Sequence, residues 1–321
     1  MKKKFRKNRA GENGVSPHPE THPYEEDCTM ERIGWIGTGV MGKSMCRHIL
    51  KKGYPVSVHN RTKDKADDLC RGGAEWLETP GDVASRSDVV FTMVGGPADV
   101  EAVILGKDGV LERIGPGSVI VDMTTSEPSL ARRIYAEAKS RSVSSLDAPV
   151  SGGDVGACEG TLAIMTGGDE DAFRRVLPLF ERMGTNIARM GGPGMGQHTK
   201  MSNQILVAST MIGVVESLLY ARRAGLDPGR VIEVIGKGAA SSWAINHLGP
   251  RIVRGDFAPG FYIRHFVKDM GIALLEAGKM KLSLPGLALV NQFYTAAMAE
   301  GLEMNGTQAL YRVLDAMNRP A

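Results

Sequence analysis

Short apolar runs alternate with helical stretches between residues 32 and 150, and this alternation limits the possible folds more than any other feature of the chain. Each run has the length of a buried strand, and the stretches between the runs have helical spacing. Such alternation predicts βαβ units and a parallel sheet covered by helices. The expected strands are RIGWIG, PVSVHN, DVVFTMV, SVIVDMT and SSLDAPV, and the expected helices lie at 43–52, 63–71, 99–105 and 129–140.

The strand patterns end after residue 190, and only helical patterns follow. We therefore expect an α/β fold with a Rossmann-type doubly wound parallel sheet at residues 31–192, followed by an all-α domain at 193–321 that begins with a long connecting helix. The expected elements beyond residue 160 are strands at 161–167 and 186–190, a helix at 170–183, a long apolar stretch at 197–224, and helices at 228–236, 247–254, 265–278, 284–300 and 307–317.

Length and composition are those of an ordinary globular protein. The 321 residues include 42% hydrophobic and 23% charged side chains, which excludes wholesale disorder and fibrous architectures. The formal net charge of +3 is too small to indicate nucleic-acid binding. The histidines lack metal-ligand spacing, and the cysteines contain no CxxC pair, so neither a metal site nor a disulfide framework is expected. The cysteines are Cys28, Cys46, Cys70 and Cys158.

Residues 1–30 are polar, contain three prolines and show no apolar periodicity, so we expect a disordered leader. Its basic start is followed by no apolar run of the kind found in signal peptides. The sequence also contains no run of about 18 apolar residues. We therefore expect a cytoplasmic protein that neither spans nor binds a membrane. Met30 directly precedes the first strand and is an alternative start.

A glycine-rich loop with the pattern G-x-G-x-x-G follows the first expected strand and precedes the helical stretch MGKSMCRHILKKG. The first glycine permits a tight turn, the second lets a pyrophosphate approach the backbone, and the third allows the helix to pack on the strand. The N-terminus of the helix adds N–H donors. This context favours a dinucleotide site over a merely structural turn. The expected cofactor contacts are Gly37, Thr38, Gly39, Val40, Met41 and Gly42.

The second expected strand ends at Asn60, Arg61 and Thr62, where an NAD enzyme usually has Asp or Glu against the ribose. A carboxylate there would repel a 2′-phosphate, whereas Arg61 can pair with that group and its two neighbours can donate hydrogen bonds to it. We therefore expect NADP as cofactor, with NADPH preferred over NADH. If Arg61 is only a solvated surface cation, the preference stays open.

Lys200, Asn203 and Gln204 have the spacing of one polar helix face within an otherwise apolar segment. Reduction of a carbonyl develops alkoxide charge, which a nearby ammonium can stabilise and protonate. Burial and a second cation such as Lys268 would lower the pKa of Lys200 toward the pH of operation. The alternative is a lysine that forms a structural salt bridge at the domain boundary.

Ser151, Gly152 and Gly153 end the SSLDAPV run, where successive backbone N–H groups and one hydroxyl can form an anion-binding nest. A carboxylate would fit there. The alternative is an ordinary glycine turn.

Taken together, four sequence blocks resemble the β-hydroxyacid dehydrogenase family, which includes 3-hydroxyisobutyrate dehydrogenase, tartronate semialdehyde reductase and glyoxylate/succinic semialdehyde reductase. The resemblance covers residues 31–318. The blocks are IGWIGTGVMG at the cofactor loop, DAPVSGG at 147–153, GPGMGQHTKMSNQ at 192–204 and FVKDMGIAL at 266–274.

The resemblance implies a role for particular residues. It assigns catalysis to Lys200 with Asn203 one turn later, and binding of the substrate carboxylate to Ser151, Gly152 and Gly153. This chain departs from the family at MVGGP (93–97), where many relatives have Leu-Pro. The remaining cofactor contacts that the resemblance implies are Val94, Gly95, Thr125 and Lys268.

The expected activity is hydride transfer between NADP(H) and a small 3- or 4-carbon hydroxy acid or semialdehyde, with Lys200 as general acid/base. Candidate substrates are 3-hydroxyisobutyrate, tartronate semialdehyde and succinic semialdehyde, together with the two-carbon aldehyde acid glyoxylate. We expect a small carboxylate-bearing substrate as partner and assembly into a homodimer or homotetramer. Two alternatives are a catalytically silent NADP-binding interaction protein and an imine reductase on the same scaffold, and retention of Lys200 argues against both.

Overall fold

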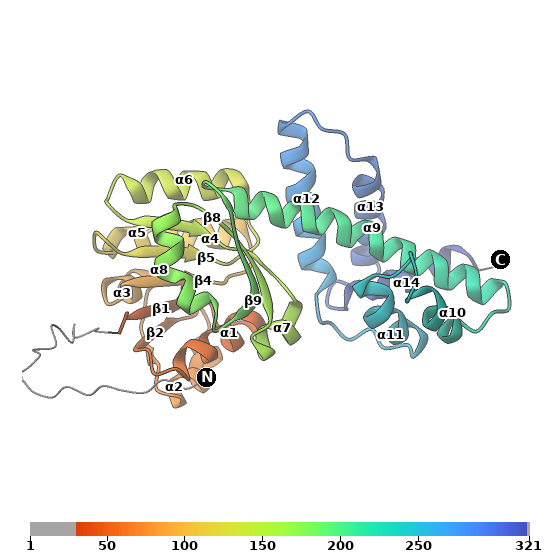
Figure 1. Cartoon of the computed structure of the whole chain (residues 1–321), viewed down its shortest axis with the longest axis horizontal. Helices are drawn as coiled ribbons and strands as arrows, with labels where there is room; N and C mark the ends of the chain where they lie inside the picture. Colours follow the sequence, from red (N-terminus) through yellow and green to blue (C-terminus); the bar gives the residue numbers. More distant parts are fainter. Residues whose placement is uncertain (1–29, 320–321) are drawn as a thin grey trace, which may run out of the picture. The chain divides into compact units, whose positions relative to one another are not determined.

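The computed structural model describes residues 30–319, and from Glu31 onward the chain forms one compact unit. The prediction for residues 1–29 lies outside the described residues. The α/β fold expected from the sequence is confirmed, with a sheet that ends at Gly191 and helices from Met195 onward (Figure 1).

The sheet has the order β3-β2-β1-β4-β5-β6-β8-β7, with β9 beside β8. The first six strands pair in parallel, as predicted. However, β8 runs antiparallel to β6 and β7, because only ten residues, Gly152–Thr161, separate β7 from β8 and a parallel return needs a longer crossover. The strands are β1 (Ile33–Ile36), β2 (Val56–His59), β3 (Glu75–Trp76), β4 (Val89–Thr92), β5 (Val119–Asp122), β6 (Ser144–Asp147), β7 (Val150–Ser151), β8 (Leu162–Gly167) and β9 (Gly184–Gly191).

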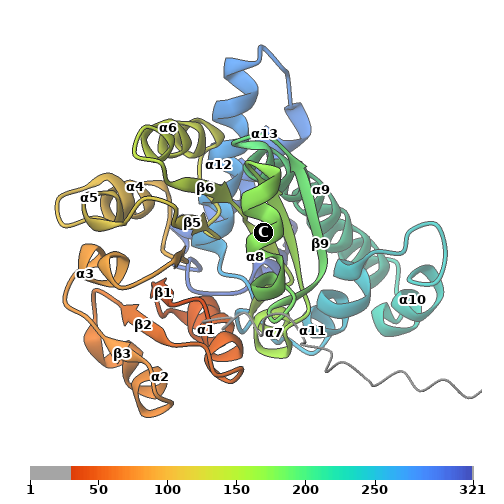
Figure 2. The ribbon, with the colours of Figure 1, turned by 60° about the vertical axis from the view of Figure 1, so that its left-hand side comes forward.

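Helices cover both faces of the sheet because alternate strand residues point to opposite sides. Phe91 belongs to the core beneath α1 and α8, whereas Val90 packs beneath α4 and α6 (Figure 2). The helices of this part are α1 (Val40–Leu50), η1 (Lys63–Ala66), α2 (Asp67–Arg71), α3 (Pro80–Ser85), α4 (Pro97–Leu105), α5 (Val110–Arg113), α6 (Pro128–Lys139), α7 (Gly153–Glu159) and α8 (Glu170–Phe180).

The helical part is built around α9 (Met195–Arg223), which packs on α12, α13 and α14. Among the described helices, only α9 is long and apolar enough to cross a membrane by length and composition, a test that core helices also pass. The other helices are α10 (Pro228–Ile235), η2 (Ala244–Leu248), α11 (Gly249–Val253), α12 (Ile263–Lys279), α13 (Pro285–Ala299), η3 (Thr307–Ala309) and α14 (Leu310–Met317).

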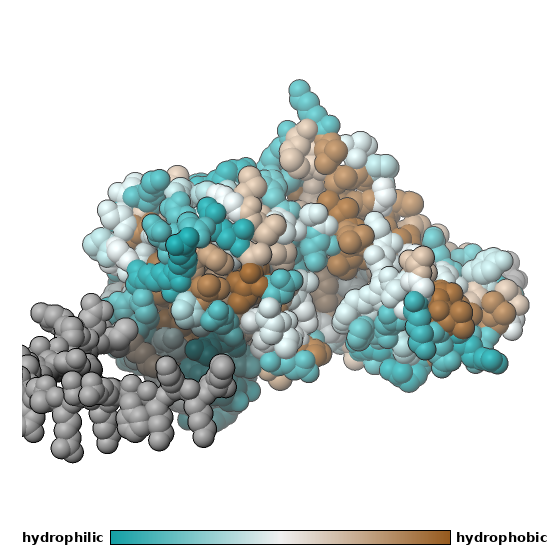
Figure 3. Space-filling model, viewed as in Figure 1, coloured by the Kyte–Doolittle hydropathy of each residue, from teal (hydrophilic) through white to brown (hydrophobic). Residues whose placement is uncertain are grey.

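Several large apolar side chains of the helical part face outward. Leu206 and Tyr220 on α9, Leu275 on α12 and Leu289 on α13 are each more than half exposed. Figure 3 shows hydrophobic residues gathered over α12 and α13. Isolated exposed apolar residues are normal, whereas groups of them mark contact surfaces. The homo-oligomer expected from the sequence stays a prediction.

The carboxyl ends of four neighbouring strands lie in one row. Ile36 of β1, Thr92 of β4, Asp122 of β5 and Asp147 of β6 are successive register partners. The loops that follow these residues therefore meet at one edge, which includes the point where the strand order reverses between β1 and β4. Ligands of open α/β sheets bind at such an edge.

Candidate active site

The glycine loop between β1 and α1 has a different steric demand at each glycine. A Cβ at Gly37 would lie 2.2 Å from the Met93 carbonyl oxygen, and one at Gly42 would lie 2.1 Å from the Gly37 carbonyl oxygen. Gly37 also has a φ of 96°, which favours glycine. In contrast, no atom lies within 4 Å of the Cβ position at Gly39. The loop is thus closed toward the protein and open at its middle glycine, as a phosphate-binding loop requires.

Thr38 and Asn60 hold this loop against the end of β2. The Thr38 N–H donates to Asn60 Oδ1 over 2.9 Å, and Asn60 Nδ2 donates to the Thr62 carbonyl over 2.7 Å. Asn60 therefore braces the loop, a role the sequence analysis did not assign. The Thr38 hydroxyl is buried without a hydrogen-bond partner, and Val40 is exposed at the first turn of α1, whereas Met41 packs on the core. A buried unpaired hydroxyl in a glycine cradle fits a nicotinamide dinucleotide.

Arg61 lies on the surface at the end of β2. Its side chain is 90% exposed and its nearest ionic contact is Asp99, 3.5 Å away. An ion pair this exposed is weak, so the guanidinium remains accessible to a ligand. Thr62 beside it is also exposed.

The loops after β4 and β5 contact each other and the helical part. The Val94 N–H donates to the Thr124 hydroxyl over 3.0 Å. Lys268 Nζ of α12 donates to the Thr125 carbonyl over 2.7 Å, and a Cβ at Gly96 would lie 3.0 Å from Lys268 Cδ. The structure thus brings predicted residues Val94, Thr125 and Lys268 together. At neighbouring Gly95, a Cβ would lie 2.4 Å from Asp99 Oδ2.

Lys200 lies in the second turn of α9 and is 6% exposed. Burial lowers the pKa of Lys200 to about 8. The Asp269 carboxylate opposes this shift, and Lys268 adds a smaller lowering. A lysine whose pKa is about 8 can both donate and accept a proton at physiological pH. The side chain therefore has the properties of a general acid/base.

Two hydrogen bonds and one ion pair connect Asn203 to Lys268. Asn203 Nδ2 donates to Gln204 Oε1 over 2.7 Å, and Gln204 Nε2 donates to Asp269 Oδ2 over 2.6 Å. The other Asp269 oxygen lies 3.1 Å from Lys268 Nζ. Because Asp269 can only accept, the orientation of Gln204 is fixed, and this in turn directs the Asn203 amide nitrogen toward Gln204. Sequence reasoning placed Gln204 on the polar face but missed this link.

The loop at Ser151–Gly153 faces the helical part. Gly152 and Gly153 have φ values of 134° and 64°, a region that favours glycine. A Cβ at Gly153 would lie 3.6 Å from the Gly260 carbonyl oxygen, so the segment before α12 approaches this loop closely. All three predicted substrate residues therefore lie where the two parts of the unit meet.

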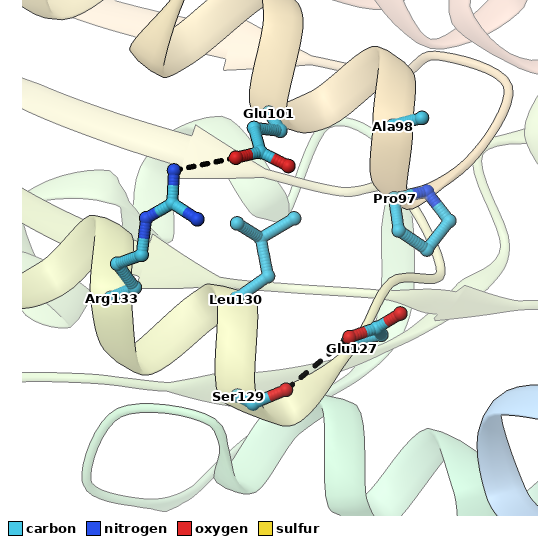
Figure 4. Close-up of a pocket in the computed structure, with 7 residues that line it drawn as sticks. All are labelled: Pro97, Ala98, Glu101, Glu127, Ser129, Leu130 and Arg133. Carbon is cyan, nitrogen blue, oxygen red and sulfur yellow. Dashed lines mark hydrogen bonds and ion pairs between the residues drawn. The ribbon is translucent and has the colours of Figure 1, made fainter. Parts of the chain in front are cut away.

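A separate surface cavity of about 530 Å³ lies between the N-terminal ends of α4 and α6 (Figure 4). Its only cation, Arg133, is paired with Glu101, and a second carboxylate, Glu127, accepts a hydrogen bond from Ser129. This charge distribution disfavours an anion, so we do not assign the cofactor phosphates to this cavity. The described residues also contain no cluster of potential metal ligands.

The chain matches two protein-family descriptions that together cover nearly all described residues. Residues 32–192 match the NAD-binding domain of 6-phosphogluconate dehydrogenase, and residues 194–314 match a family described as NAD-binding of NADP-dependent 3-hydroxyisobutyrate dehydrogenase. The chain belongs to the β-hydroxyacid dehydrogenase family.

Relatives of this β-hydroxyacid dehydrogenase cover almost the whole chain. A probable mitochondrial 3-hydroxyisobutyrate dehydrogenase-like 1 of Arabidopsis thaliana is 53% identical over 89% of this chain and 86% of its own. The 2-hydroxy-3-oxopropionate reductase of Escherichia coli is 39% identical over 89% and 98%. A solved 3-hydroxyisobutyrate dehydrogenase of Mycobacterium tuberculosis is similar with a TM-score of 0.82 at 27% identity, over 90% of this chain and all of that one. The chain is thus an NAD(P)-dependent hydroxyacid dehydrogenase.

The position and pKa of Lys200 predict opposite pH profiles for the two directions of this dehydrogenase. With Lys200 as general acid/base, carbonyl reduction would need the protonated lysine, so kcat/KM for reduction should fall as pH rises through about 8. Alcohol oxidation needs the neutral amine, so kcat/KM for oxidation should fall as pH decreases through about 8. Initial rates across pH in both directions test this expectation, and parallel profiles would contradict it.

Proposed function

We propose that the protein interconverts a small 3- or 4-carbon hydroxy acid and its semialdehyde with NADP(H), using Lys200 as general acid/base. The observation that carries the proposal is the buried Lys200 ammonium, whose pKa is lowered and which interacts electrostatically with Asp269 and with Lys268, the lysine bonded to the loop after β5.

When bound, the nicotinamide cofactor supplies or accepts the hydride. Lys200 holds its ammonium at the reacting oxygen, stabilises the developing alkoxide and delivers the proton. In the oxidation direction, the neutral amine removes that proton. Lys268 donates a hydrogen bond to the Thr125 carbonyl at the cofactor edge, which is the row of loops after β1, β4 and β5. Asn203 faces the substrate, and Gln204 fixes the orientation of the Asn203 amide. Burial of Lys200, Gln204 and Asp269 helps to exclude water from the reacting atoms.

The proposed preference for NADPH rests on the end of β2. No carboxylate stands among Asn60, Arg61 and Thr62, and the exposed Arg61 guanidinium is available to pair with a 2′-phosphate. The family that matches the helical part is described as NADP-dependent, which supports the proposal.

Replacement of Arg61 by alanine should weaken NADPH binding at least about tenfold and change NADH binding little, because only NADPH carries the phosphate that the guanidinium can pair with. Fluorescence titration of both cofactors measures the two Kd values. Arg174→Ala, which removes an exposed arginine of α8 paired with Glu170, is the matched control. Equal weakening of both cofactors, or a wild type that favours NADH, would contradict the prediction.

The substrate proposal rests on Ser151, Gly152 and Gly153, whose loop can accept a carboxylate. Among the candidates we favour tartronate semialdehyde. This compound is 2-hydroxy-3-oxopropionate, and one relative is named 2-hydroxy-3-oxopropionate reductase. A screen of NADPH oxidation with tartronate semialdehyde, succinic semialdehyde and glyoxylate, together with NADP reduction by 3-hydroxyisobutyrate, tests the proposal. Saturable turnover of at least one of these acids is expected, and absence of turnover with all of them would refute it.

The two alternatives give different results in the same screen. A catalytically silent interaction protein would bind NADPH without turnover, and an imine reductase would turn over cyclic imines in preference to semialdehydes. Retention of the buried Lys200 favours the dehydrogenase over both.

A further inference from the structure

Asp147, the last residue of β6, caps the N-terminus of α9 although it lies 47 positions before Gly194 in the sequence. Its carboxylate accepts the Gly194 N–H on Oδ1 over 2.7 Å and the Gln197 N–H on Oδ2 over 2.8 Å. These amides lie at the N-terminus of α9, where backbone N–H groups lack helical partners. Gly194 has no side chain that could cap the helix, and the first turn of α9 contains no acid. The anion that complements this helix end therefore comes from β6.

Two glycines give the Asp147 carboxylate its space. A Cβ at Gly167 of β8 would lie 2.6 Å from Asp147 Oδ1, and a Cβ at Gly196 of α9 would lie 2.9 Å from Asp147 Oδ2. The Asp147 side chain is therefore buried between β8 and α9 with both oxygens occupied. Burial raises the pKa of Asp147 to about 6, against the lowering effect of the two N–H groups, so the residue is ionised at neutral pH.

Gln197 connects the same helical turn to the cofactor edge. Its Nε2 donates to the Thr124 carbonyl over 2.8 Å, and its Oε1 accepts the Ser126 N–H over 2.9 Å. Thr124 and Ser126 flank Thr125, whose carbonyl Lys268 holds. The side chain is fully buried. The first turn of α9 is thus attached to the loop after β5 by Gln197 and to the end of β6 by Asp147.

Lys200 lies one turn beyond Gln197, and the substrate loop begins at Ser151, four residues after Asp147. We infer that Asp147 and Gln197 are positioning residues that fix the Lys200 ammonium relative to the substrate loop and the cofactor edge. The inference rests on the proposed function of Lys200. Acid/base and hydride transfer require close alignment, and a misplacement of about 1 Å can cost on the order of 100-fold in rate.

The Asp147→Asn variant tests the carboxylate with almost unchanged shape. The amide has one acceptor oxygen, so its nitrogen must face one of the two N–H donors. We expect kcat to fall by roughly 30- to 100-fold, with Kd for NADPH changed by less than about threefold. The deuterium isotope effect on kcat, measured with NADPH deuterated at the transferred position, should increase as hydride transfer becomes slower. Because an isotope effect does not depend on the fraction of folded enzyme, simple destabilisation would leave it unchanged.

Gln197→Met supplies a second variant that keeps the backbone bond to Asp147 and removes the bridge to Thr124 and Ser126. Its kcat should fall about tenfold, again with an increased isotope effect. Val176→Ala is the control, because Val176 is buried in α8 outside the site and its truncation lowers stability alone. This control should melt at a lower temperature with the wild-type kcat and isotope effect.

Amide hydrogen exchange provides a readout that does not need turnover. In Asp147→Asn, exchange should accelerate at residues 194–200 more than in the remaining core helices, whereas Val176→Ala should not show this pattern. If either folded variant of Asp147 or Gln197 retains the wild-type kcat and isotope effect, and exchange of the first turn of α9 is unchanged, the inference is overturned. An inactive wild type would instead refute the proposed function, and the exchange data would still decide the positioning role.

Discussion

The Lys200→Ala variant is expected to lose at least about 99% of wild-type kcat in both directions, because a positioned acid/base contributes on the order of 100- to 10,000-fold. The loss should fall on kcat, since the role proposed for Lys200 is at the reacting oxygen and not at the phosphates that anchor the cofactor. Kd for NADPH, measured by fluorescence titration, should therefore stay within about threefold of wild type, a change worth less than about 0.7 kcal/mol.

Two further variants separate the chemistry of Lys200 from its charge and from general damage. Lys200→Arg retains a cation, but a guanidinium does not release its proton in proteins, so it should be nearly as inactive as alanine. Lys139→Ala removes an exposed lysine at the end of α6 that bonds only to Tyr135, and it should keep full activity. A folded Lys200→Ala enzyme with near wild-type turnover would show that another group moves the proton.

Local patterns carried most of the fold prediction. A parallel strand buried on both faces reads as a continuous apolar run, and β1, β4 and β5 each do so. The glycine loop was predicted from its G-x-G-x-x-G spacing after a strand, although the carbonyl that excludes a side chain at Gly37 belongs to Met93, 56 positions away. The strand runs and the glycine spacing are local patterns, which can be recognised in the sequence.

The missed elements are short or depend on distant partners. β3 has two residues and α7 has seven, too few to show a period, and GDVGACE in α7 contains two glycines that disfavour a helix. The direction of β8 follows from where its partners lie. Sequence periodicity predicts a strand at 161–167 but contains no information on its orientation.

The active site shows the same limit. Lys200, Asn203 and Gln204 could be grouped from helical spacing, but the structure buries Gln197, Lys200 and Gln204 as one stripe and leaves Asn203 half-buried. Gln197 stands three residues before Lys200, and that spacing was a usable signal. The bond from Gln204 to Asp269 joins residues 65 positions apart, and no local pattern indicates such a contact.

The charged groups that act on Lys200 favour an anionic substrate. Lys200 and Lys268 contribute two ammonium groups, and Asp269 contributes one carboxylate. Lys200 is largely protonated at pH 7 because its pKa is about 8. The group therefore has a net charge of about +1 before substrate binds, in surroundings where Lys200 and Asp269 are almost fully buried. A monoanionic substrate would balance this charge, and a neutral substrate would leave it unpaired.

The enzyme should therefore discriminate strongly between a semialdehyde acid and its neutral amide or ester. An unpaired buried polar group costs roughly 1–3 kcal/mol, and a charged group costs more. A neutral analogue of equal size would leave both the excess ammonium and the N–H groups of the Ser151–Gly153 loop without partners. The expected kcat/KM ratio is at least about tenfold and rises with the number of unpaired groups, as for sites built to bind a polar substrate group.

The decisive comparison is kcat/KM for succinic semialdehyde against its methyl ester, and for glyoxylate against its amide, at pH 7 and saturating NADPH. A carboxylate beside Lys200 should also stabilise its protonated form, so the pKa seen in kcat for reduction should lie above the pKa of about 8 seen in kcat/KM. Lys279→Ala, which removes an exposed α12 cation paired with Glu276, should leave the acid-to-ester ratio unchanged and so controls for net charge. Comparable kcat/KM values for the acids and their neutral analogues would mean that the substrate carboxylate contacts neither the ammonium groups nor the Ser151–Gly153 loop, and the assignment of a carboxylate-bearing substrate would fail with it.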